Sequence, residues 1–158
     1  MTHVLVWVHL VAAVAWIGGM LFLSLVVVPV LKREPFAAER GILFRAIGRR
    51  FRLLVWVSVV VLLTTGPLLL SLRGESLLEP VGWSVVLRMK LLLVAVLIGL
   101  TAVHDFWLGP RVGRLLSASP GSQALAENLQ IRLSPWIARL GLVLALGVLL
   151  AATALVRT

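Results

Sequence analysis

The chain has 158 residues, of which 61% are hydrophobic, with no cysteine and a formal net charge of +9. The lack of cysteine excludes disulfides, thiolate metal sites and thiol redox chemistry. A charge of +9 would suggest a nucleic-acid partner for a water-soluble protein, but the apolar content exceeds what a soluble domain of this length needs, so we expect no nucleic acid.

Four apolar runs are each long enough to cross a bilayer as a helix. They cover about residues 4–31, 53–72, 83–108 and 136–156. The runs are continuous instead of alternating, which favours helices over a barrel. The first run exceeds signal-peptide length and lacks a basic leader, so we expect it to be retained. The sequence therefore predicts one all-α integral membrane domain over residues 1–158, a four-helix bundle.

The basic residues predict how this bundle lies in the membrane. The connection after the first run carries most of them, against Glu34 and Glu39: Lys32, Arg33, Arg40, Arg45, Arg49, Arg50 and Arg52. The third connection carries three arginines, whereas the second has only Arg73 beside two glutamates. Because basic loops stay in the cytoplasm, we expect connections 1 and 3 there and both termini outside. This is the pattern of a multi-pass protein of a prokaryotic cytoplasmic (inner) membrane.

Three local patterns refine the connections and helix ends. Apolar residues interleaved with arginines between residues 32 and 52 favour a short interfacial amphipathic helix in the first connection. Thr64-Thr65-Gly66-Pro67 predicts a kink near the outer surface. Pro135 suits the start of the last helix, so residues 124–133 form either a separate short helix or a lead-in to it.

Four ionisable residues lie inside the apolar runs, where they are costly and by default mark a functional site: His9, Arg88, Lys90 and His104. In the first run, His9, Trp16 and Met20 share one helical stripe. In the third run, Lys90 and His104 also share a stripe. We therefore expect the first and third helices to face each other across a site, with the second and fourth as scaffold.

Depth separates these residues. Lys90 and His104 are about 21 Å apart along their helix, too far for one small site. His9 lies about one and a half turns and Lys90 about two turns from the outer surface, so we expect them to be neighbours. Arg88 points about 200° away from Lys90, so at most one of them faces the core. The alternatives are snorkelling for Arg88 and Lys90, a hydrogen-bonded core role for His9, and an interfacial or Asp105-paired role for His104.

Haem fits this set of residues best, because histidine is a common axial ligand and apolar bundles hold planar macrocycles. His9 and His104 are the candidate metal ligands, and Lys90 or Arg88 would pair with a propionate. Trp16 is too deep to be an interfacial anchor and should pack in the core or against a ligand. Copper is the second option, with Met20 and Met89 as soft ligands. A proton-relay or quinone site is the third.

The predicted helices also resemble known families. WVHLVAAVAWIGGMLFLSLVVVPVL, FRLLVWVSVVVLLTTG and GWSVVLRMKLLLVAVLIGL resemble the first three helices of CopD-like copper-resistance membrane proteins. The first and third of these segments are also similar to HemJ, the membrane protoporphyrinogen oxidase. The HemJ histidines and lysine then fall on His9, Lys90 and His104. This resemblance implies b-type haem bound near His9 and Lys90, and an oxidoreductase activity.

Together these patterns predict a haem b-binding membrane protein with a redox or haem-handling role. His9 is the expected axial ligand, Lys90 its propionate partner and His104 a second ligand or a second site, with Trp16, Met20 and Arg88 as further cofactor-binding candidates. Copper uptake and a non-catalytic accessory subunit of a respiratory complex are the alternatives. The expected partners are the lipid bilayer, a quinone or porphyrin, and either further copies of the chain or a respiratory complex.

Overall fold

The computed structural model describes residues 2–33, 35, 40–72, 74, 82–109 and 125–155, with side chains except at 40, 125–135 and 155. These ranges contain helices and no strand, which confirms the predicted all-α fold. In chain order the helical segments are α1 (Thr2–Phe22), η1 (Leu23–Val27), α2 (Val28–Leu31), α3 (Arg40–Leu72), α4 (Val85–Ala102), η4 (Val103–Leu108) and α6 (Leu125–Leu155).

Four stretches are long and apolar enough to span a membrane: Thr2–Leu31, Gly41–Leu72, Val85–Leu108 and Trp136–Ala154. They match the four predicted runs and identify a multi-pass membrane protein. The segments η1 and η4 are π-helical and are continuous with their flanking α-helices, so the first and third spans are each one unbroken helix.

Two helices begin earlier than predicted. The second starts at Arg40 instead of residue 53, so residues 40–52 of the connection, where a short amphipathic helix is expected, form the first turns of α3 and are continuous with the span. No proline occurs between residues 40 and 66 to end the helix at the membrane surface. The last helix starts at Leu125 and continues through Pro135, so the lead-in alternative is the correct one.

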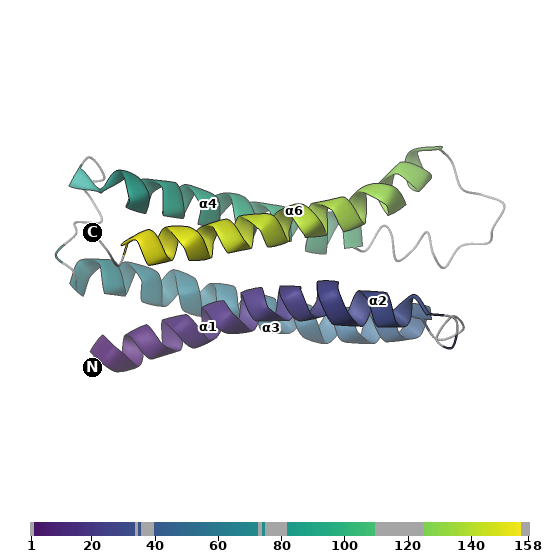
Figure 1. Cartoon of the computed structure of the whole chain (residues 1–158), viewed down its shortest axis with the longest axis horizontal. Helices are drawn as coiled ribbons and strands as arrows, with labels where there is room; N and C mark the ends of the chain where they lie inside the picture. The colour runs from purple at the N-terminus through teal and green to yellow at the C-terminus, as the bar shows by residue number, and fades with distance from the viewer. Residues whose placement is uncertain are drawn as a thin grey trace.

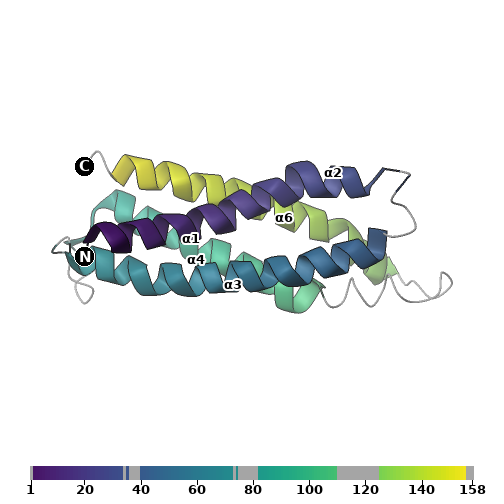
Figure 2. The same ribbon diagram turned by 90° about the horizontal axis from the view of Figure 1, so that it is seen from below.

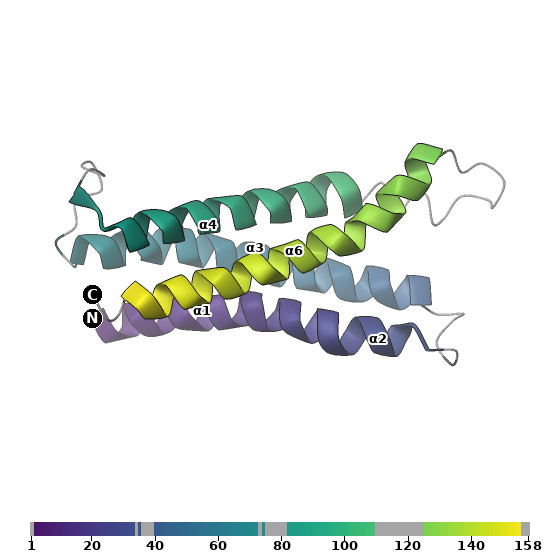
Figure 3. The same ribbon diagram turned by 45° about the horizontal axis from the view of Figure 1, so that its top comes forward.

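The spans form an antiparallel four-helix bundle (Figures 1 and 2). Both termini lie at one end, and the start of α3 and the end of α2 lie at the other, as in Figure 3. The closest helix pairs are α1 with α3 and α4 with α6. The expectation that the second span serves only as scaffold is wrong, because α3 supplies a polar partner to both histidine clusters described below.

Both π-helical segments lie shortly before a proline. Pro29 follows η1 and Pro110 follows η4, each two positions after the segment ends. At the first, the Val28 N–H donates to the Leu23 carbonyl, five residues back. Inside a helix, a proline ring clashes with the carbonyl four residues before it; at Pro29, which lies in α2, the π turn widens the helix where this crowding arises. Pro67, by contrast, is accommodated inside α3, which continues through the 64–67 segment where a kink is predicted.

The buried core draws on all four spans: Trp16, Ile17, Val55, Val59, Leu97 and Ala145. Glycine sets the helix spacing at one edge of this core. The Phe51 ring of α3 occupies the space into which a Cβ atom at position 19 would project, whereas position 18 faces open space. Only a residue without a side chain at position 19 therefore allows α1 and α3 to approach this closely.

We predict opposite effects for the two neighbouring glycines. Gly19→Ala should lower the free energy of unfolding in detergent by about 1–3 kcal/mol, because the new methyl group displaces Phe51. Gly18→Ala should leave it unchanged or raise it by up to about 1 kcal/mol, through helix propensity alone. Phe51→Leu should lower the free energy of unfolding less in the Gly19→Ala background than in the wild type. Equal midpoints for the two alanine variants in thermal unfolding would contradict this packing.

Candidate functional site

His9 is held by a hydrogen-bond chain that ends on the backbone of α3. Its Nδ1 lies 2.7 Å from the Thr65 hydroxyl oxygen, and that hydroxyl donates to the Val61 carbonyl at 2.6 Å. A hydroxyl carries one hydrogen, so the hydroxyl of Thr65 must accept from His9. The proton of the neutral imidazole is therefore on Nδ1, and the lone pair is on Nε2.

His9 also has neighbours on α3 and α4 besides Thr65. The His9 Cε1 atom lies 3.7 Å from the position of a Cβ at Gly66, so the ring packs beside the α3 backbone. Lys90, on α4, lies within electrostatic range of His9. Thr65, which the sequence reasoning missed, is the residue that contacts His9 directly. We call His9, Thr65 and Lys90 the outer cluster.

The residues next to Lys90 face the other way. Arg88 is exposed on the bundle surface, and Met89 is 52% exposed. Lys90 itself is half-buried. This agrees with the prediction that only one of the two cations points towards the core.

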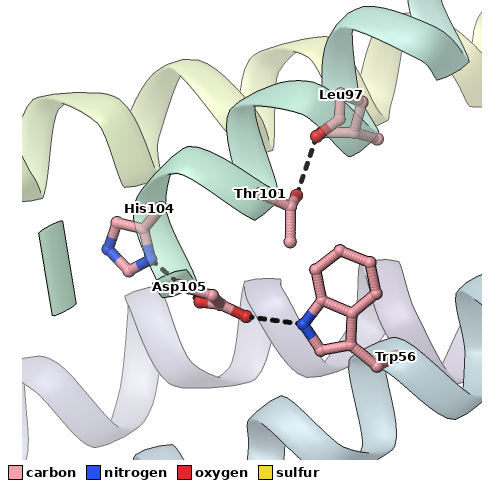
Figure 4. Close-up of polar contacts among 5 residues, drawn as sticks. All are labelled: Trp56, Leu97, Thr101, His104 and Asp105. Atoms are coloured by element: carbon pink, nitrogen blue, oxygen red, sulfur yellow. Dashed lines mark hydrogen bonds and ion pairs between the residues drawn. The ribbon is translucent and has the colours of Figure 1, made fainter. Parts of the chain in front are cut away.

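His104 belongs to a second cluster, within η4 (Figure 4). Its Nδ1 lies 3.2 Å from Asp105 Oδ1, and the Trp56 indole N–H of α3 donates to Asp105 Oδ2 at 3.2 Å. The Trp56 ring also packs on Phe106, with centroids 5.1 Å apart. Of the alternatives for His104, the pairing with Asp105 is the one found. The carboxylate thus joins η4 to α3.

Arg52 completes this inner cluster of Arg52, Trp56, His104 and Asp105. Its Nη2 lies 3.4 Å from the Cβ position of Gly109, directly after η4. A side chain at position 109 would also come within 3.3 Å of the His104 carbonyl, so glycine leaves room for the guanidinium there. Gly109 is itself helical, and its N–H donates to the His104 carbonyl. Arg52 therefore packs beside the backbone at this point, although its buried Nε has no hydrogen-bond partner among the described residues.

The two clusters lie at different levels of the bundle. Their α3 members, Trp56 and Thr65, are nine positions apart, or about 13 Å along the helix axis. Trp16 and Met20 follow His9 along α1; Trp16 is part of the core and Met20 packs against it. The Met20 methyl group approaches Gly141 of α6 there. Among the described residues no three His, Asp or Glu side chains converge as a ready metal site.

The bundle and its two histidine clusters define a helical multi-pass membrane protein with ionisable groups held inside its spans. The chain belongs to the family described as a domain of unknown function, DUF4149, which matches residues 11–120. That segment contains Lys90, His104 and Thr65, and it begins two residues after His9.

A relative of this chain is an uncharacterized protein of Aquifex aeolicus (strain VF5). The two are 34% identical over 112 residues, which cover 70% of this chain and 73% of the relative. No solved structure matches the chain.

Sequence reasoning missed Thr65 as the partner of His9, Trp56 as the partner of Asp105, and Arg52 beside Gly109. Threonine is common in membrane helices and usually bonds to its own backbone, as Thr64 does here with the Val60 and Val61 carbonyls. The available signal was the pair of threonines in an otherwise apolar run, at the depth predicted for His9. For Trp56 the signal was an indole within an apolar run.

We predict that Thr65→Val weakens the bundle while Thr64→Val does not. The first change leaves the His9 Nδ1–H without its acceptor, which should cost about 0.6–1.7 kcal/mol of stability, the range of interhelical hydrogen bonds in membranes. The Thr64 hydroxyl is exposed and bonds only within α3. Thermal unfolding in detergent measures both, and Thr65→Ser, which keeps the hydroxyl, should behave as wild type. Equal loss in the two valine variants would contradict the His9–Thr65 bond.

For the inner cluster we predict that Trp56→Phe costs about 1–2 kcal/mol of stability, because Asp105 loses a donor while the ring contact with Phe106 is kept. Trp136→Phe is the matched control, since Trp136 is 64% exposed. Asp105→Asn in the Trp56→Phe background should add less than it does alone, because the two residues share one hydrogen bond. Additive losses, measured by the same unfolding assay, would show that the pair is not coupled.

Proposed function

We propose that this protein binds haem b within its bundle and has a redox or haem-handling role, with His9 Nε2 as the axial ligand. The observation that supports this is the chain from His9 Nδ1–H to Thr65 to the Val61 carbonyl. Histidines that bind metals usually donate their other N–H to a fixed acceptor, which sets the tautomer and the ring orientation. His9 has this arrangement without a metal being needed to impose it.

Two further groups near His9 suit a macrocycle with acidic side chains. Lys90 is a half-buried cation in electrostatic range of His9, and its ammonium group would pair with a haem propionate. Trp16 lies two turns further along the same stripe of α1, and its buried indole N–H has no acceptor among the described residues. A ligand with carboxylate or carbonyl oxygens would satisfy this donor. When bound, haem would supply one-electron redox chemistry.

Copper is less well supported by the same geometry. The Met20 methyl group lies near Gly141, whose Cβ position is also within 4 Å of Leu97 and Leu100. Met89 is eight positions before Leu97, or about 12 Å along α4, and its side chain is half exposed. The two thioethers therefore do not converge with a histidine. Soft-metal sites need such convergence.

His104 lies at the wrong level to share a haem with His9 in one chain. It would serve a second site, with Asp105 as the carboxylate that orients its ring. We further propose that the arginine-rich end of the bundle, at the start of α3, faces the cytoplasm of a prokaryotic cell. Association with further copies or with a respiratory complex is compatible with the exposed apolar faces.

We predict that protein purified after haem-replete expression shows a Soret band, and that His9→Ala abolishes it. Thr65→Val should keep the band but lower haem affinity about 10–100-fold, the usual effect of losing the group that orients a ligating histidine. His104→Ala and Thr64→Val should retain wild-type affinity. The measurement is haem titration of the detergent-solubilised variants, followed by absorption spectra in both oxidation states.

The outcomes separate the competing functions. No Soret band in the wild type would overturn the haem proposal, and stoichiometric copper in the purified protein would favour the copper alternative. Co-purification with a larger oxidase or reductase, together with activity indifferent to His9→Ala, would favour the accessory-subunit alternative. If His9→Ala and His104→Ala both remove the band, the ligand assignment to His9 alone is wrong.

A further inference from the structure

An open apolar groove of about 510 Å³ runs along the surface between α1 and α3, away from both histidine clusters. Its α1 wall includes Trp7, Val11 and Ala15, and its α3 wall includes Leu54 and Val57. Small residues at the helix contact, Ala12, Ala15 and Ser58, leave the hollow between the larger side chains. Because Trp7, Val11 and Val57 are largely exposed, the groove opens to the surroundings of the bundle.

The groove has one charged end. Arg50 is the basic residue in its lining, and it lies where the apolar part of α3 begins, three positions before Leu53. The two helices are antiparallel, so Trp7 lies at the opposite end. A long apolar chain with an anionic group at the Arg50 end would complement these walls.

The length of the groove matches one leaflet. From Leu53 to Val61, the apolar lining of α3 extends about 12 Å along the helix axis. The hydrocarbon core of a bilayer is about 30 Å thick, so one leaflet contributes about 15 Å. An acyl chain that starts at the Arg50 level would therefore occupy the groove and end near the bilayer centre.

We propose that this groove is a binding site for an anionic phospholipid of the leaflet at the arginine-rich end. One acyl chain lies between α1 and α3, and the phosphate pairs with the Arg50 guanidinium. The position of the charge at the interfacial end favours a phospholipid over a neutral isoprenoid lipid, which would gain nothing from Arg50. A guanidinium also presents a planar fork of donors that suits phosphate oxygens.

The test uses the full chain in a mild detergent with phosphatidylglycerol or phosphatidylcholine of the same acyl chains, and native mass spectrometry to count retained lipids. The wild type should retain one phosphatidylglycerol with a preference of about fivefold, since one basic residue near the surface contributes about a factor of five in affinity. Arg50→Gln should remove the preference. Arg49→Gln is the matched control, because Arg49 is exposed on the same helix turn but does not line the groove.

A second pair of variants tests the groove itself. Val57→Trp should block it and reduce retention of both lipids about fivefold or more, whereas Val60→Trp, at an exposed position outside the lining, should not. Ala15→Leu fills the groove from α1 and provides the same test if Val57→Trp fails to fold. Equal effects of the two glutamine variants would overturn the proposal in favour of diffuse attraction to the arginine cluster. Retention of a neutral quinone that is insensitive to Arg50→Gln would overturn it in favour of an isoprenoid ligand.

Discussion

Hydrocarbon offers no hydrogen-bond partner, so polar groups inside the four spans depend on partners within the bundle. Among the described residues, the buried Trp16 indole N–H and Arg52 Nε lack one. Most hydroxyls solve this locally, as Thr101 does by bonding to the Leu97 carbonyl of its own helix. Each histidine cluster also has a bond between helices: His9 bonds to Thr65, and Asp105, beside His104, accepts from Trp56. Both partners are on α3. The first bond joins α3 to α1, and the second joins α3 to η4, so it links the α1–α3 pair to the α4–α6 pair.

This requirement also explains why the two clusters differ in what they can do. Thr65 is committed as a donor to Val61, so it fixes His9 as a donor through Nδ1 and leaves Nε2 for a ligand. When it is ionised, Asp105 can only accept hydrogen bonds. One of its oxygens accepts from the Trp56 indole N–H, and the other faces His104 Nδ1. The outer cluster therefore presents a nitrogen lone pair inside the bundle. The inner cluster joins helices at the end where the arginines gather.

The sequence was sufficient to predict the fold and the levels of the charged residues. Hydropathy finds the spans because it averages over whole turns, and depth follows from counting residues along a helix of constant rise. It could not identify the start of α3, since a helix that leaves the bilayer need not end there when no proline interrupts it. The sequence also could not identify the partners of His9 and Asp105. A threonine or tryptophan looks the same in sequence whether it faces lipid or a histidine across the bundle.

Helical phase on α3 shows why its roles can coexist. Val55 and Val59 face the core, Leu54 and Val57 face the groove beside α1, and Trp56 faces η4. Consecutive residues of a helix are about 100° apart around its axis, so the side chains at positions 55, 56 and 57 face three different neighbours. A change on the groove face therefore alters lipid contact without touching the partner of Asp105. In this way one helix packs in the core, borders the groove and supplies partners to the polar clusters. Each of these roles can be tested by its own substitution.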